Sequence, residues 1–214
     1  MTVFSNNNTK MKKSARPGEK FVAFGLPPIK TCPQAGACKD GCYACAGRMA
    51  MQAATTCQEF RYALSQRVYF LEYLEDALRE VQRPGIKLYV RLHDSGDFYS
   101  REYLRAWIKF ASMHPDVIFY AYTKCVSMVK AETLPDNMII AFSYGGLEDN
   151  LIDPAKDRHV IVVESENAIP KGYADGSKDD HAVLENRCIA LVYHNSKKKW
   201  GQTHFQDVQV PEVV

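Results

Sequence analysis

The chain has 214 residues, of which 46% are hydrophobic and 24% are charged, and its formal net charge is +2. Such values are typical of a globular protein with a core of its own, and they argue against a disordered chain. No apolar run approaches the ~20 residues needed to cross a bilayer, and the basic N-terminus lacks the apolar stretch of a signal peptide. We therefore expect a cytoplasmic protein with no membrane partner.

Residues 1–20 are polar and basic and show no periodicity, so we expect a flexible or surface-draped basic arm ahead of a single α/β domain at 21–214. Residues 1–48 hold eight Lys or Arg against Glu19 and Asp40, and a second basic run occupies 197–199. A solvated surface is the ordinary explanation of such runs, and a phosphate-binding patch is the alternative.

A first short strand is expected at 21–25, and five further β-rich runs lie at 86–93, 117–123, 138–143, 159–164 and 188–194. The segment 46–81 predicts one or two helices, and an amphipathic segment capped by Ser100 predicts a helix that ends near Met113. Because strands that alternate with helices form parallel sheets, we expect an α/β fold with a mainly parallel six-stranded sheet in a partial (β/α) barrel.

Each of the five later strands ends in residues with polar side chains. These residues are His93 and Asp94, Thr123 and Lys124, Ser143, Glu164, and His194. Because functional sites of parallel sheets lie at the carboxyl ends of the strands, we expect these side chains to converge on one rim.

Four of the seven cysteines follow the first strand with the spacing Cys32-x5-Cys38-x3-Cys42-x2-Cys45. An odd count and the absence of a secretory signal argue against a disulfide framework. Cysteines that recur this closely hold iron–sulfur clusters, so we predict a cluster of 4Fe–4S type in this loop. Structural zinc normally uses a second close pair of ligands, which is missing here; zinc and metal-free cysteines are the alternatives.

The spacing from Cys38 to Cys45 resembles that of radical S-adenosylmethionine enzymes, in which three cysteines hold a 4Fe–4S cluster and leave one iron open. This resemblance implies a six-stranded partial barrel, a cluster loop after the first strand, and S-adenosylmethionine as a further cofactor. The sequence departs from the pattern in having a fourth cysteine and in placing Ala44, rather than an aromatic residue, before the third one.

The segments 32–44, 91–107 and 119–124 resemble a phage family known as gene product 88, and the likeness covers most of the chain after residue 20. The resemblance implies a phage origin, a location in the host cytoplasm, and a cluster held by Cys32, Cys38 and Cys42. It brings no established reaction. Spacing alone favours the three cysteines from Cys38 to Cys45 instead.

His93, Asp94 and Asp97 are the candidate catalytic residues, with roles in binding substrate, a metal ion or the methionyl group of a cofactor. Helix capping by the acids and rim packing by His93 are the alternatives. The candidate substrate-binding residues are Arg91, Lys124, Ser143 and Glu164, although Arg91 and Lys124 could equally pair with the acids. We expect Cys125 on the same rim as a reserve ligand and Cys188 at the opposite end of the sheet.

Three functions follow from these features. The first is an enzyme of radical S-adenosylmethionine type, or a descendant without its chemistry, that acts on a small molecule. The second is a cluster-containing nucleic-acid-binding protein or nuclease, with a divalent ion on the His-Asp-Asp rim. The third is an interaction protein with a structural cluster. Three cysteine ligands would leave an iron open, whereas four would close the site.

Overall fold

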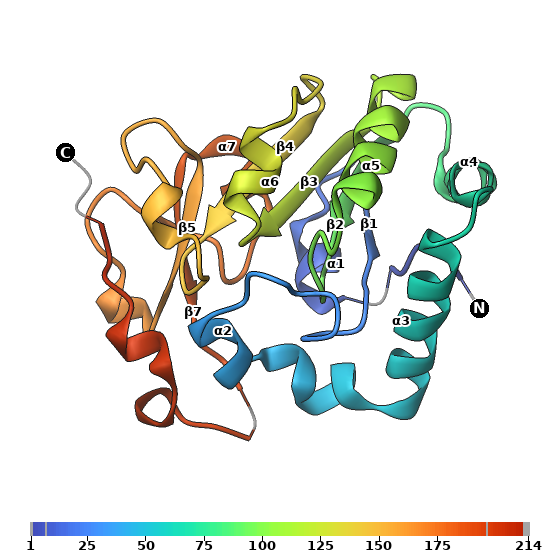
Figure 1. Cartoon of the computed structure of the whole chain (residues 1–214). Coiled ribbons are helices and arrows are strands. Elements are labelled where there is room, and N and C mark those ends of the chain that lie inside the picture. The colour runs from blue at the N-terminus through green and yellow to red at the C-terminus, as the bar shows by residue number, and fades with distance from the viewer. Residues whose placement is uncertain (1, 7, 196, 212–214) are drawn as a thin grey trace.

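The computed structural model describes residues 2–6, 8–195 and 197–211. Within these residues seven strands form one sheet in the order β1-β2-β3-β4-β5-β7-β6, and all neighbouring strands are parallel. The sheet curls into a half-barrel within a single α/β domain (Figure 1). The strands are β1 (Glu19–Phe24), β2 (Lys87–Leu92), β3 (Ile118–Thr123), β4 (Met138–Ser143), β5 (His159–Val163), β6 (Ala174–Asp175) and β7 (Cys188–Val192).

The connections contain α-helices and short 3-10 turns. The α-helices are α1 (Thr9–Ser14), α2 (Ala37–Asp40), α3 (Gln52–Ser65), α4 (Phe70–Val81), α5 (Arg101–Met113), α6 (Val126–Lys130) and α7 (His181–Glu185). The 3-10 turns are η1 (Tyr43–Cys45), η2 (Gly47–Ala50), η3 (Asp149–Leu151), η4 (Glu166–Ala168), η5 (Trp200–Gln202) and η6 (His204–Asp207). Among the helices of the described residues, none has the length and apolar character needed to cross a membrane.

The six predicted strands are all present, each within two residues of its expected bounds, and the expected helical segment at 46–81 is the pair α3 and α4. The predicted number of strands is wrong, because the two-residue strand β6 adds a seventh at the edge of the sheet. A run of two residues is too short to show any periodicity. The N-cap prediction is confirmed, since the Ser100 hydroxyl accepts a hydrogen bond of 3.2 Å from the Tyr103 amide.

Alternation along the strands divides the core between the two faces of the sheet. The outer face packs against α3, α4 and α5, and the fully buried Trp107 of α5 contacts Phe24 of β1 with 5.2 Å between ring centroids. The inner face carries aromatic rings, among them Phe21 and Tyr89, which stack at 4.5 Å. Away from the carboxyl ends of the strands, the inside of the half-barrel is therefore filled with side chains.

The N-terminal segment, expected to be a flexible or surface-draped arm over residues 1–20, contacts both faces of the sheet. Helix α1 packs on the inner face, where Met11 is fully buried with Phe21 and Tyr89, and Phe4 joins the core on the outer face. Asn8 caps α1 by accepting hydrogen bonds from two amides of its first turn. Met11, the ion pair of Lys10 with Asp180 and the hydrogen bond from the Asp180 amide to the Ser14 hydroxyl all join α1 to the rest of the domain. No periodicity over so short a helix could indicate these contacts.

Replacing Met11 by Ala should lower the free energy of unfolding by about 2–5 kcal/mol, because it leaves a cavity at a fully buried position. The neighbouring Lys12 is exposed, so Lys12→Ala should change it by less than about 0.5 kcal/mol. Urea denaturation of the two variants measures the difference. Equal effects would mean that α1 is not docked on the sheet.

Candidate functional site

A cavity of about 290 Å³ opens at the carboxyl ends of the strands, on the inner face of the half-barrel. Inward-facing side chains of β2, β3, β4, β5 and β7 form one wall, and the cysteine loop after β1 forms another. Side chains at its lining include Cys32, Cys38, Cys42, Tyr43, Arg91, His93, Asp97, Tyr122, Lys124, Ser143, Val162, Tyr193 and His194. Most of the strand-end residues that were expected to converge, among them His93, Lys124, Ser143 and His194, thus line the same cavity.

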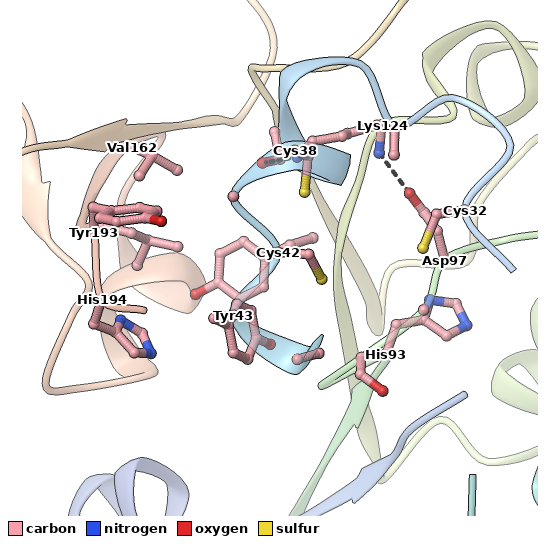
Figure 2. Close-up of a pocket in the computed structure, with 18 of the residues that line it drawn as sticks. Cys32, Cys38, Cys42, Tyr43, His93, Asp97, Lys124, Val162, Tyr193 and His194 are labelled. Carbon is pink, nitrogen blue, oxygen red and sulfur yellow. Dashed lines mark hydrogen bonds between the residues drawn. The ribbon is translucent and has the colours of Figure 1, made fainter. Parts of the chain in front are cut away.

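Three of the four clustered cysteines line this cavity, and Figure 2 shows the sulfur atoms of Cys32, Cys38 and Cys42 bordering the same space. Cys45 lies in the turn η1 and is not among the lining residues. The three cysteines that share the cavity are those implied by the family resemblance. They are not the three that spacing alone favours.

The cysteine loop is joined on one side to the loop after β4. The Cys38 amide donates to the Gly145 carbonyl at 3.1 Å, and the Leu147 amide donates to the Gln34 carbonyl at 2.9 Å. Gly36 lies so close to this loop that a Cβ atom would come within 2.9 Å of the Gly146 oxygen. Glycine is therefore required at position 36 by the close approach of two backbones.

The C-terminal segment supports the cysteine loop from the other side (Figure 1). The Asn195 amide group donates to the carbonyls of Gly41 and Cys42, both at 3.2 Å, and Lys198 forms an ion pair with Asp40. Phe205 fills the space against Gly41, where a Cβ atom would meet its ring at 2.9 Å. Residues more than 150 positions away in sequence thus fix the shape of this loop.

The three thiols of the cavity favour the protonated state. Burial raises the pKa of Cys32 to about 12, and the neighbouring Asp97 adds to the effect. Burial also raises the pKa of Cys38, although the Lys124 ammonium partly opposes it, and burial together with Cys45 raises that of Cys42. A metal centre that binds here must displace protons from these thiols.

The loop after β2 lies beside the loop after β1, as predicted for consecutive parallel strands. The Leu26 amide donates to the Ser95 carbonyl at 2.8 Å. Gly96 has a φ of +83°, and a Cβ atom there would lie 2.5 Å from the Thr31 hydroxyl and 2.6 Å from Leu26. Only glycine meets both conditions, the left-handed backbone and the close contact.

His93 begins this loop in a strained conformation, with φ at +64°. Such a conformation costs a non-glycine residue about 1–3 kcal/mol and is found disproportionately at functional sites. Its Nε2 atom lies 3.0 Å from the Tyr103 hydroxyl, whereas Nδ1 is buried without a hydrogen-bond partner in the described residues. Burial, reinforced by Arg91, lowers the pKa of His93 to about 3, so the imidazole is neutral.

Asp97 lines the cavity, but its carboxylate is already engaged. Oδ1 accepts hydrogen bonds from the Phe98 amide at 2.8 Å and from the Thr123 hydroxyl at 2.5 Å, and Oδ2 accepts one from the Lys124 amide at 2.9 Å (Figure 2). Burial raises the pKa of Asp97, while these donors lower it in part. Asp97 ties the loops after β2 and β3 together, as a positioning group would.

Asp94 and Glu164 do not line the cavity with the other candidates. Both line a neighbouring groove, where Asp94 is buried close to Arg61 and Glu164 is exposed. Burial raises the pKa of Asp94, and Arg91 and Arg61 oppose that rise. The expected His-Asp-Asp group is therefore divided between two hollows: His93 and Asp97 line the cavity, Asp94 lines the groove, and the chain turns at the left-handed Gly96 between the two acids.

Lys124 and Ser143 lie next to each other in the cavity wall, and the Lys124 ammonium donates to the Ser143 hydroxyl at 2.7 Å. Arg91 is held by Asp180, with 3.5 Å between Nη1 and Oδ1, and lies 5.0 Å from the centre of the Tyr122 ring. Although burial lowers the pKa of Arg91, the Asp180 carboxylate raises it overall. Arg91 thus stays charged at the floor of the cavity, with its Nε atom lacking a partner among the described residues.

Cys125 and Cys188 both lie away from the cavity. Cys125 is buried with its thiol directed at the Phe98 carbonyl, 3.2 Å away, so it does not stand ready as a reserve ligand. Cys188 starts β7, at the amino end of that strand, as expected.

Sequence reasoning did not find Asp180, Tyr43 and Tyr193. Asp180, at the start of α7, forms an ion pair with Arg91 at the floor of the cavity. The two tyrosines flank the cavity mouth. Tyr43 had a signal, since it lies within the Cys42-x-x-Cys45 segment. Asp180 had none.

The described residues contain no group of three or more His, Cys, Asp or Glu side chains that could hold a metal ion. The divalent ion expected on the rim residues stays a prediction.

Comparison with known proteins gives one family and one similar protein from a phage. The family described as Gene product 88 matches residues 2–207. The Gene 88 protein of Mycobacterium phage L5 is 29% identical over 127 residues, which are 56% of this chain and 50% of that protein. The chain therefore matches only about half the length of this relative. No solved structure matches.

The family match takes in the β1 loop with its cysteines, the loop after β2 and the supporting C-terminal segment. It covers nearly the whole chain and agrees with the resemblance carried by the three sequence segments. The chain belongs to the Gene product 88 family.

Proposed function

We propose that this protein binds an iron–sulfur cluster of 4Fe–4S type through Cys32, Cys38 and Cys42, beside a small-molecule site in the same cavity. The observation that carries the proposal is that three thiols from one loop line one cavity at the carboxyl ends of a parallel sheet, while the fourth does not. Clusters of this kind need several thiolates around a compact inorganic core.

A cluster suits this arrangement better than a single ion does. In a cluster each thiolate binds a different iron atom, so the sulfur atoms surround the core and need not meet at one point. Three sulfur atoms that border a common space suit the first geometry.

Charge in the cavity supports the same assignment. Three thiolates would bring negative charge into a buried site, which is costly without compensation. The Lys124 ammonium already acts on Cys38 and lowers the pKa that burial raises. The Asp97 carboxylate acts in the opposite direction, because it raises the pKa of Cys32 and Cys38, so the positive charge of Lys124 has to offset it as well as burial.

Ligation by three cysteines leaves one iron without a protein ligand, which is the arrangement of radical S-adenosylmethionine enzymes. When reduced, such a cluster supplies one electron to a sulfonium bound at the open iron. On the protein side, Arg91, Ser143 and the His93 Nδ1 atom, which has no partner among the residues that the structure describes, are polar groups placed to bind and orient a small molecule in the rest of the cavity. We therefore favour an enzyme of this type.

The two alternatives find less support in the geometry. A nuclease with a rim-bound divalent ion would need Asp94 and Asp97 together, but they line different hollows. A purely structural cluster would need a fourth ligand, and Cys45 does not line the cavity.

Anaerobic purification should give a brown protein with iron and sulfide in equal amounts. Cys32→Ser, Cys38→Ser and Cys42→Ser should each lose the colour, whereas Cys45→Ser and Cys188→Ser should keep it, because only the first three share the cavity. Electron paramagnetic resonance of the reduced protein should change when S-adenosylmethionine is added. A colourless protein with stoichiometric zinc would refute the proposal, and a spectrum indifferent to S-adenosylmethionine would refute its enzymatic part.

A second test needs no iron. The thiol pKa values are raised in the folded state, so above about pH 9 the unfolded chain loses protons that the folded metal-free protein retains. The free energy of unfolding should therefore fall as the pH rises from 8 to 10. Denaturation at several pH values should show a smaller fall for the variant with Ser at all three positions; an identical fall would show that these thiols are not buried together.

A further inference from the structure

A second hollow, a groove of about 1420 Å³, adjoins the cysteine cavity. Its lining comes from α1, from the segment that follows the cysteines, from α3 and from the C-terminal segment. Asn8, Lys10, Tyr43, Tyr193 and His194 line both hollows. The groove therefore leads directly to the mouth of the cavity, and nothing in the proposed cluster site explains it.

The groove is strongly basic in a chain that is nearly neutral. Six Lys or Arg side chains line it against the two carboxylates of Asp94 and Glu164, whereas the whole chain has 27 basic and 25 acidic residues. The basic residues are Lys10, Lys12, Arg48, Arg61, Lys198 and Lys199. They come from segments far apart in sequence, so folding has gathered them.

Four of these cations form no ion pair in the described part of the chain. Lys10 pairs with Asp180 and Lys198 with Asp40, but the remaining four form no such ion pair. Lys12, Arg48 and Lys199 are exposed, and the buried Arg61 donates to the backbone carbonyls of Val3 and Thr2 and interacts at longer range with the Asp94 carboxylate. Unpaired cations along a groove fit a polyanion with regularly spaced charges.

Aromatic rings occur among these cations at the cavity mouth. Tyr43, 39% exposed, lies 5.4 Å from the His194 ring, and Trp200 lies 5.6 Å from Tyr193. Rings interspersed with Lys and Arg are typical of surfaces that stack unpaired bases and track a phosphate backbone. A duplex hides the faces of its bases, so this combination favours a single strand.

We propose that this groove binds single-stranded nucleic acid, with phosphates on Lys12, Arg48, Arg61 and Lys199 and with bases stacked at Tyr43 beside the cavity. Bound in this way, a strand places one nucleotide at the entrance to the cysteine cavity. The binding rests on groove residues and not on the cluster, so it is measured in the metal-free protein and repeated after cluster loading.

Fluorescence anisotropy with labelled DNA and RNA strands of ~12 nucleotides tests the proposal at several salt concentrations. Single strands should bind more tightly than duplex DNA, and log K should fall with log salt with a slope of about −3, from four contacts at ~0.7 each. Arg48→Ala combined with Lys199→Ala should weaken binding about 25-fold at ~0.1 M salt and reduce the slope by about 1.4.

The matched control is Lys109→Ala with Lys171→Ala, which removes the same charge at exposed positions outside the groove and should leave affinity within about twofold. Tyr43→Leu should weaken binding at least about fivefold with an unchanged slope, and Tyr43→Phe should preserve it, because stacking needs only the ring. Should Tyr43→Leu fail to fold by circular dichroism, Arg48→Glu with Lys199→Glu gives the decisive comparison at exposed positions.

Three results would overturn the proposal: no binding of either single strand at low salt, equal or tighter binding of the duplex, or an equal loss in the control pair. Each of them leaves the cysteine-bound cluster untouched. Conversely, a colourless protein that binds single strands would remove the cluster and keep the groove.

Discussion

The buried carboxylate of Asp180 is the interaction on which the inner side of the half-barrel depends. It lies 2.5 Å from the Lys10 ammonium and 3.5 Å from the Arg91 guanidinium, and it accepts a hydrogen bond of 2.9 Å from Tyr120. A buried carboxylate is costly unless it is paired, so these partners are obligatory. Although burial raises the pKa of Asp180, Arg91 and Lys10 lower it overall. Because its partners come from α1, β2 and β3, one charge fixes a helix to the sheet and forms the floor of the cavity.

The rim above that floor has two kinds of residue. Some use their polar groups to hold loops together, and others keep polar groups that are not engaged in this way. Asp97 uses its carboxylate to join two loops, and the strained His93 keeps a buried ring nitrogen that has no hydrogen-bond partner in the described ranges of the chain. The thiols of Cys32, Cys38 and Cys42 line the same space. Rigid positioning of a few reactive groups by engaged neighbours is the general arrangement of sites that bind and transform small molecules.

The sequence could predict what depends on local pattern and not what depends on contacts between distant segments. Apolar runs located six strands, and strand ends located most of the rim, because parallel strands present their carboxyl ends together. Asp94 and Asp97 are three residues apart yet line different hollows, and between them the chain turns at Gly96, whose backbone is left-handed. Which cysteines share the cavity likewise depends on the turn η1, and spacing alone cannot specify its direction.

The support of the cysteine loop by Asn195, Lys198 and Phe205 has a consequence for the order in which the protein matures. The ribosome releases the cysteines first and their supports last, with some 150 residues of synthesis between them. At ~5–20 residues per second the loop waits about 8–30 s for its final partners. During that interval its thiols belong to an incomplete wall and are open to oxidation. The wall of the cavity is therefore completed only at the end of synthesis, once the C-terminal segment has packed against the loop.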